Sequence, residues 1–170
     1  MTFDKPDSIS RRGILERAGL LGTALTVGLS ETASGATSNS PTPQQLKVIV
    51  AGGHPGDPEY GCGGTVARYA DLGHDVVLLY LNNGLPRNPP PPAPATDRVA
   101  EAAKACGILK ARPLYAGQID GEAIVDAEHS DRFRALLEAE RPHLVFTHWP
   151  IDNHADHRAI SMLVYDACCA

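Results

Sequence analysis

The sequence lacks the features by which nucleic-acid-binding and cysteine-based metal proteins are recognised. Its 170 residues include 15 Lys and Arg against 20 Asp and Glu, so the formal net charge is -5. An acidic chain without a basic stripe interleaved with aromatic side chains is not expected to bind nucleic acid. The four cysteines form no C-x-x-C pair, which excludes a zinc ribbon and leaves any disulfide pairing open; they are Cys62, Cys106, Cys168 and Cys169.

A hydrophobic run long enough to span a membrane is also missing near the N-terminus. The apolar segment from Ala18 to Leu29 falls short of the about 20 residues that a spanning helix needs. Because Arg11 and Arg12 precede this segment and small residues follow it, residues 1–36 are predicted to be a twin-arginine export signal. A disordered basic segment is the alternative interpretation.

This signal implies contact with the twin-arginine export machinery and a periplasmic or extracellular location. Residues 37–45, rich in Ser, Thr, Pro and Gln, are predicted to be a linker. The remaining residues, 46–170, are short enough to form one domain.

A complete glycine fingerprint for dinucleotides is absent. Gly61-Cys62-Gly63-Gly64 has Val66 where G-x-G-x-x-G requires its last glycine, and residues 54–60 separate these glycines from the preceding apolar run. The fingerprint places its glycines directly between a strand and a helix. We therefore expect neither a nicotinamide nor a flavin cofactor.

What the domain does contain is an alternation of β-like and helix-like segments. Strands are predicted at residues 46–51, 76–81, 112–116 and 143–147, and helices at 63–72, 97–106, 131–140 and 155–167. Thr96 and Ser130 are predicted to cap helix starts, Gly73 and Gly107 to end helices, and Pro89–Pro92 to form a stiff loop. The alternation predicts an α/β fold, Rossmann-like with three layers and a mostly parallel sheet.

Two short polar motifs each follow a β-like run. His54-Pro55-Gly56-Asp57 comes after the first run, and His154-Ala155-Asp156-His157 follows the fourth by a short loop. Loops after parallel strands line one crevice at the carboxyl ends of the strands. We therefore predict that His54, Asp57 and His157 bind one divalent ion, Zn²⁺ or another divalent metal, since imidazole and carboxylate ligands suit catalytic zinc.

These motifs, in this order, resemble those of the LmbE-like or PIG-L-like zinc-dependent N-acetylglucosaminyl deacetylases. The resemblance extends from Lys47 to the end and includes three segments: residues 53–59, 98–102 and 147–157. It implies hydrolysis of N-acetyl groups on amino sugars or glycoconjugates, with His54, Asp57 and His157 as zinc ligands.

The resemblance also implies roles for neighbouring residues. His154 would stabilise the oxyanion and protonate the leaving amine, Asp156 would tune that histidine, and Arg98 would bind substrate. For two of these residues a purely structural role is the alternative. Asp156 would be a carboxylate favoured at a helix N-terminus, and Arg98 would form an ion pair with Glu101 on the same helix. Trp149 is predicted either to stack on a sugar face or to pack its loop.

Two departures from the family pattern bear on activity. Gly56 stands where the family usually has the aspartate that acts as general base, so Asp152, Glu59 or His148 would have to replace it, or His154 would make both proton transfers. Members of the family usually continue well beyond the second motif, so the chain is expected to be a C-terminally truncated fragment, a frameshifted product or a minimal variant, with an exposed sheet edge and an incomplete pocket wall. Two functions therefore remain: a zinc-dependent deacetylase, and a non-catalytic protein that binds metal or carbohydrate on the same fold.

Overall fold

The computed structural model describes residues 44–88 and 95–169. The predicted export signal, most of the predicted linker and the proline loop lie outside the described residues, as does the side chain of Thr96. The chain divides into two units, residues 1–41 and 42–170, and everything described below lies in the second. Among the described helices, none combines the length and the apolar character that crossing a membrane requires.

Four parallel strands form one sheet. They are β1 (Lys47–Gly52), β2 (Asp75–Asn82), β3 (Arg112–Gln118) and β4 (Leu144–Phe146). Their order is β3-β2-β1-β4, with β1 hydrogen-bonded in parallel to both β2 and β4. The chain thus adds β2 and β3 on one side of β1 and then returns to add β4 on the other side. In parallel sheets this reversal opens a crevice at the carboxyl ends of the two strands.

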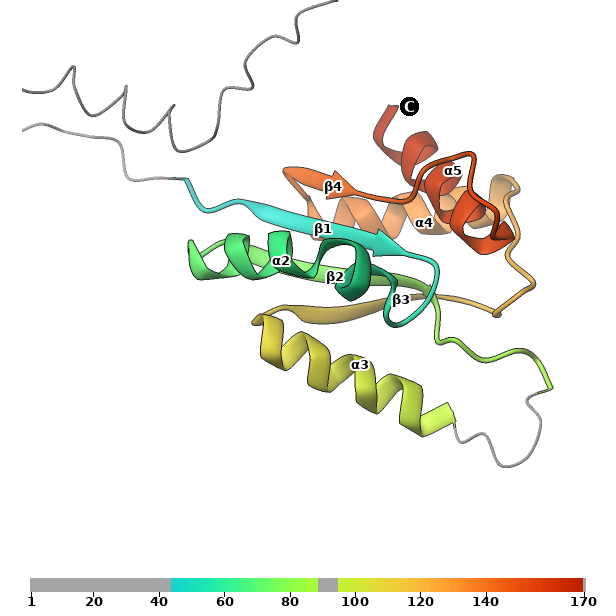
Figure 1. Ribbon diagram of the computed structural model, residues 1–170. Coiled ribbons are helices and arrows are strands. Elements are labelled where there is room, and N and C mark those ends of the chain that lie inside the picture. The colour runs from blue at the N-terminus through green and yellow to red at the C-terminus, as the bar shows by residue number, and fades with distance from the viewer. Residues whose placement is uncertain (1–43, 89–94, 170) are drawn as a thin grey trace, which may run out of the picture. The chain divides into compact units, whose positions relative to one another are not determined.

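The apolar runs of β1 and β2 are explained by burial on both faces of the sheet. Val48 and Val50 belong to one buried cluster, with Val66 of helix α2 (Asp57–Asp71) and Cys106 of helix α3 (Ala95–Leu109). Alternate strand residues, such as Ile49, belong to a second cluster that includes side chains of helices α4 (Ala127–Glu140) and α5 (Ala155–Cys169). Figure 1 shows the two helix pairs on opposite sides of the sheet. The predicted α/β fold with three layers and a parallel sheet is therefore confirmed.

The helix α2 (Asp57–Asp71) begins six residues earlier than the sequence indicated. Its start is favoured by Pro58 in the first turn and by the Glu59 carboxylate, which accepts a hydrogen bond from the Gly56 amide at 3.1 Å. Packing against the sheet therefore outweighs the poor helix propensity of the glycines at positions 61, 63 and 64. As predicted, Gly73 follows the helix end, with a positive φ of 84°.

Three further helices complete the fold: α3 (Ala95–Leu109), α4 (Ala127–Glu140) and α5 (Ala155–Cys169). Three predicted boundaries are wrong. Thr96 does not precede α3 but lies inside it, because the helix begins at Ala95. Gly107 lies inside α3, which ends just before Lys110, a residue with a positive φ of 54°. The cap of α4 is Asp126, whose carboxylate accepts from the His129 amide, and Ser130 lies inside the helix. Two residues of equal capping chemistry stand four positions apart, so sequence alone favoured the wrong one.

Candidate metal centre

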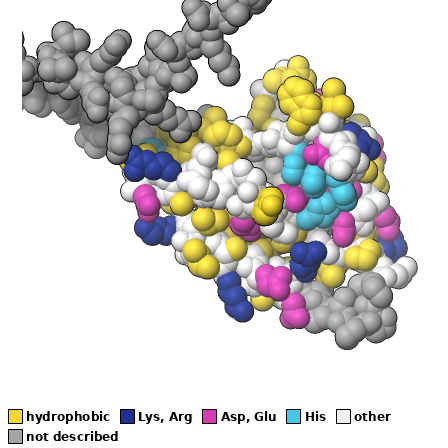
Figure 2. All heavy atoms as spheres, in the orientation of Figure 1, with side chains coloured by type: hydrophobic (Ala, Val, Ile, Leu, Met, Phe, Trp, Pro, Cys, Tyr) yellow, Lys and Arg dark blue, Asp and Glu magenta, His cyan; other side chains and the backbone are white. Residues whose placement is uncertain are grey.

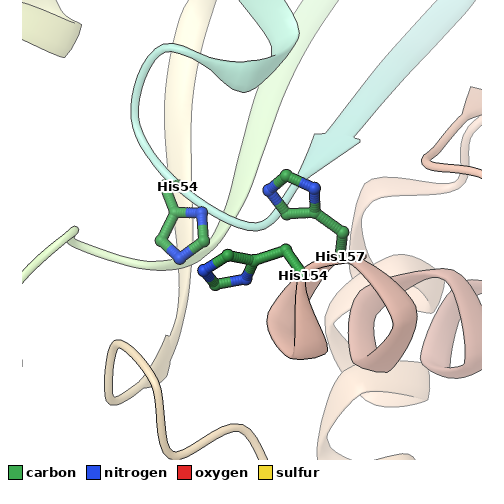
Figure 3. Close-up of side chains that lie close together, drawn as sticks. All are labelled: His54, His154 and His157. Carbon is green, nitrogen blue, oxygen red and sulfur yellow. The ribbon is translucent and has the colours of Figure 1, made fainter. Parts of the chain in front are cut away.

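The two predicted motifs meet at the carboxyl edge of the sheet. The loop after β1 carries His54 and leads to Asp57, the first residue of α2. The segment after β4 carries His154 and leads to His157 in the first turn of α5. Figure 3 shows the imidazoles of His54, His154 and His157 turned toward one another. Each of the three offers a ring nitrogen within 4.8 Å of the others. Histidine side chains consequently gather on one face of the domain, with acidic side chains beside them (Figure 2).

The Asp57 carboxylate lies at the centre of this cluster. Its Oδ2 is 3.1 Å from Nδ1 of His54 and 3.1 Å from Nε2 of His157, and it accepts a hydrogen bond from the His54 amide at 2.8 Å. Burial works against the charge of Asp57, but the His148 and His54 side chains and the His54 amide outweigh it, so the pKa of the carboxyl is held well below its usual range. The three predicted metal ligands are thus brought together.

The second nitrogen of His54 faces two further carboxylates. Nε2 of His54 lies 3.0 Å from Oδ1 of Asp120 and 3.1 Å from Oδ2 of Asp156. Burial alone would lower the pKa of His54, but the carboxylates of Asp57, Asp120 and Asp156 raise it to about 8. With Nε2–H held by two carboxylates, the His54 ring is oriented so that Nδ1 faces Asp57, an arrangement typical of metal-ligating histidines.

Asp156 occupies a different place from the one that the resemblance implied. Its buried Oδ2 accepts hydrogen bonds from the Asn82 side-chain amide at 3.0 Å and the Gly121 amide at 2.9 Å, besides its contact with His54. Its Oδ1 is buried without a hydrogen-bond partner in the described part. Only its backbone amide contacts His154, by donating to Nδ1 at 3.2 Å. The Asp156 carboxylate points from α5 into the protein interior, where it contacts His54 and not His154.

Asp152 lies behind a predicted ligand. Its Oδ1 accepts from the His154 amide at 2.8 Å and lies 3.2 Å from Nδ1 of His157. The His154 amide and the His157 side chain lower the pKa of the Asp152 carboxyl. A proton on Nδ1 leaves the Nε2 lone pair of His157 facing Asp57. The geometry thus gives Asp152 the place of an orienting group, whereas the sequence had suggested it as a base facing the ion.

Gly56 occupies the position at which the family usually has its catalytic aspartate, and the space beside its Cα is open. Gly56 has φ of 109° and ψ of -32°, and a Cβ there would meet no atom within 4 Å. Glu59, another candidate base, turns away, since its Oε1 accepts from the Tyr80 hydroxyl at 2.6 Å while Oε2 accepts from Gly56. Burial and the Glu59 carboxylate raise the pKa of Tyr80, so the phenol remains a donor. The third candidate, His148, lies within the cluster.

The two predicted substrate contacts lie at the rim of the centre. Arg98 of α3, together with Pro55, Gly56 and Glu59, lines a depression of about 180 Å³. Trp149 is 70% exposed, so it is not packed into its loop. The structure brings Arg98 close to the position of the missing base and leaves the Trp149 face open.

Two residues of the centre were missed from sequence, Asp120 after β3 and Asn82 at the end of β2. Each is a single polar residue at a strand end. The only signals were Asp120-Gly121 after a predicted strand and an asparagine closing an apolar run. Neither is specific without knowledge of the strand order.

The expected sheet edge is present at β4. A hollow of about 970 Å³ lies beside this edge and is lined by residues of α4, α5 and the segment that contains β4. Of the residues in the cluster, His148 lines it.

An α/β sheet with imidazoles and carboxylates gathered at its switch point defines a Rossmann-like protein with a candidate metal centre. Residues 48–168 match the model of the PIG-L family, described as GlcNAc-PI de-N-acetylase, and the chain belongs to this family. The resemblance stated from the motifs is therefore confirmed.

Individual relatives agree with this assignment. The chain is 29% identical over 137 residues to the diacetylchitobiose deacetylase of Thermococcus kodakarensis, covering 76% of this chain and 51% of that protein. The conserved protein TT1542 from Thermus thermophilus is 33% identical with a TM-score of 0.65, covering 72% of this chain and 55% of that one. The N,N'-diacetylchitobiose deacetylase from Pyrococcus horikoshii, at 23% identity, shares the fold with a TM-score of 0.67, covering 73% and 49%. The chain thus spans about half the length of these relatives.

Proposed function

We propose that this chain is a metal-dependent deacetylase that removes an N-acetyl group from an amino-sugar-containing substrate. The observation that carries the proposal is the convergence of the His54 and His157 imidazoles on the Asp57 carboxylate, with the exposed His154 beside them. Membership of the PIG-L family and the name of its relative, a diacetylchitobiose deacetylase, support it.

The donor set fits a divalent cation, with Zn²⁺ as the candidate. Two imidazole nitrogens and a carboxylate oxygen are ligands that zinc takes at catalytic sites. His54, Asp57 and His157 would hold the ion, and Asp152, Asp120 and Asp156 already orient the two imidazoles. A bound divalent ion supplies Lewis acidity, which polarises an amide carbonyl and makes water a better nucleophile.

His154 is the group placed to move a proton. Its Nδ1 accepts from the Asp156 amide, so a neutral ring carries its proton on Nε2. Through this Nε2–H the neutral ring can donate a hydrogen bond to an oxyanion. Once the ring has also taken up a second proton, it can give one proton to the departing amine and return to the neutral form, a transfer typically worth about 10²–10⁴-fold in rate. Arg98 and Trp149 would bind the sugar at the rim, by hydrogen bonding and by stacking on a sugar face.

One observation favours the second function, a non-catalytic protein that binds metal or carbohydrate. Gly56 supplies no carboxylate, and its backbone conformation is one that an aspartate would adopt only with strain. A chain on this fold without a base would keep its metal and its sugar contacts but turn over slowly or not at all.

Acetate release separates the two functions. Purified full-length protein loaded with Zn²⁺ is incubated with a panel of N-acetylated mono- and disaccharides and glycoconjugates, and acetate is measured with time. A deacetylase releases acetate, His157→Ala loses both metal and release, and His154→Ala keeps metal but loses most of the rate. Metal binding without release from any substrate would establish the binding protein instead.

The proposed site of action is outside the cytoplasm, and Arg11 and Arg12 support it. Replacing both by lysine is expected to trap the precursor in the cytoplasm of a host with twin-arginine transport, as followed by fractionation and immunoblotting. A control variant with Lys104→Arg leaves the motif intact and should be exported. Unchanged export of the double variant would refute the signal.

A further inference from the structure

A further hollow, which we call the α3 hollow, lies at the carboxyl end of the sheet on the side of α3. Its volume is about 570 Å³, within the range of about 300–1,000 Å³ that is typical of small-molecule sites. The segment after β2, the N-terminal part of α3 and the end of β3 form its wall. The apolar side chains on this wall are Leu85, Pro86, Val99, Tyr115 and Ile119.

The α3 hollow shares its wall with the metal centre. Leu85 lines the hollow, and its carbonyl accepts a hydrogen bond from the Asp120 amide at 3.2 Å. The Asp120 carboxylate lies 3.0 Å from His54 in the centre, while the preceding residue, Ile119, lines the hollow. A substituent on a sugar at the centre therefore reaches the hollow by crossing this wall.

Gly84 joins the wall to the rim of the centre. A Cβ at Gly84 would lie 3.5 Å from Nε of Arg98 and 3.5 Å from Cδ of Pro55. Arg98 is the predicted substrate contact at the rim, and the next residue of α3, Val99, lines the hollow. The rim that is proposed to bind the sugar is thus continuous with the α3 hollow.

The polar side chains on the wall already have partners within the protein. Both ends of the Gln118 amide bond to the backbone of Ile124, at 3.0 and 2.7 Å. The Arg87 guanidinium donates to the Glu122 carboxylate at 2.8 Å, and Oδ1 of Asn83 accepts from a backbone amide of its own turn at 3.2 Å. A sugar ring in the hollow would have to compete with these contacts for partners of its hydroxyl groups.

The apolar side chains on the wall, by contrast, face the hollow with carbon atoms. Val99 is 38% exposed. Tyr115 has its hydroxyl oxygen buried and its ring 5.2 Å from that of Tyr80, so it presents ring carbons to the hollow. Covering such a surface with an apolar group is favourable because it removes apolar area from water.

We propose that the α3 hollow is a subsite for an apolar aglycone, an alkyl or aryl group carried by the N-acetylated sugar. The inference rests on the proposed function and names its class of substrate. That class is a glycoconjugate with an apolar substituent, in preference to a sugar joined to a second sugar.

A series of glycosides that differ only in chain length tests the inference. Methyl, butyl and hexyl N-acetylglucosaminides, with diacetylchitobiose as the disaccharide, are titrated by calorimetry into zinc-loaded full-length protein carrying His154→Ala to slow turnover. A wholly buried methylene improves affinity by about fourfold, so we expect a rise of about two- to fourfold for each methylene added. The disaccharide should bind no more tightly than the methyl glycoside.

Substitutions in the same background locate the alkyl group. Val99→Asp places a charge on the wall and Val99→Trp fills the hollow, so each should bring the hexyl and methyl glycosides to within about threefold of each other in affinity. Ile108→Asp is the control for a charge on the last turn of the same helix, where Ile108 is 82% exposed. Met162→Asp is the control for the larger hollow beside β4, which Met162 lines. Both controls should keep the dependence on chain length, and circular dichroism establishes that each variant is folded.

Other outcomes overturn the inference in distinguishable ways. If the Val99 variants keep the dependence on chain length, the inference is wrong, and its loss in Met162→Asp would place the alkyl group beside β4. If affinity does not change with chain length, or if the disaccharide binds more tightly than the hexyl glycoside, the inference is also wrong.

Acetate release by the protein without the His154 substitution separates this inference from the proposed function. If chain length matters through Val99 but no glycoside releases acetate, the subsite stands and the proposed function fails. If acetate is released without any dependence on Val99, the proposed function stands and the subsite fails. If no glycoside binds, the inference fails, and if none releases acetate either, the proposed function fails with it.

Discussion

Removing the Asp156 carboxylate is the sharpest test of how the centre is built. In Asp156→Ala, His54 loses a partner, and the buried Asn82 and Gly121 amides lose the acceptor that they share. A buried donor left unsatisfied costs about 1–3 kcal/mol, and breaking a buried charged network costs about 3–5 kcal/mol. We therefore expect a loss of about 3–5 kcal/mol, a large share of the roughly 5–15 kcal/mol by which a domain is stable.

The assay is urea denaturation of metal-free protein, followed by circular dichroism. Asp156→Asn, which keeps the volume and one acceptor oxygen, should lose less stability, and its zinc affinity should fall by about 10–100-fold because His54 is less well oriented. Asp71→Ala is the control, since it removes only an exposed ion pair with Lys110. If Asp156→Ala is no less stable than Asp71→Ala, the hydrogen bonds assigned to Asp156 do not hold the centre together.

Three other changes test separate parts of the site. His54 has a pKa of about 8 without metal, so zinc binding should release a proton and weaken by about tenfold per pH unit below 8, as measured by calorimetry in buffers of different ionisation enthalpy. The same shift means that protonated His54 stabilises the metal-free chain below its unfolded pKa of about 6.5, and that this stabilisation is lost as pH rises through 8. Gly56→Ala should cost about 1–3 kcal/mol in urea denaturation, because its φ of 109° strains any Cβ-bearing residue although no atom obstructs it. Glu59→Ala and Tyr80→Phe should each lose about 1–2 kcal/mol of stability, because each removes one partner of the same hydrogen bond. The two losses should be non-additive in the double variant, and additive losses would contradict that bond.

The sequence predicted the parts of the centre whose information is local. His54, Asp57 and His157 lie in short motifs after apolar runs, and parallel strands bring such loops together whatever the details of packing. The helix starts were harder, because α2 begins at Asp57 through tertiary packing that overrides its glycines.

Asp120 was beyond prediction for a different reason. A lone Asp-Gly after a strand is ordinary turn chemistry, and it acquires meaning only when the sheet order brings it to His54. The contact between Asp156 and His54 could not be predicted from the sequence either, because it depends on the direction in which α5 points the carboxylate. Local motifs thus identified the residues that gather at the candidate metal centre, but not the residues that orient their side chains.

The distribution of carboxylates bears directly on the missing base. Asp152 is bonded to the His154 amide and faces His157, Asp156 is saturated at Oδ2 by three donors, and Glu59 is bonded to Tyr80 and Gly56. Each therefore orients another group, and turning one toward a substrate would break the contacts that position the centre. Under the proposed function, proton transfer then falls on the exposed His154, which must take a proton before it can give one to the leaving amine. A single imidazole doing both tasks takes a proton from water and later gives that proton to the amine, so it must begin each turnover neutral.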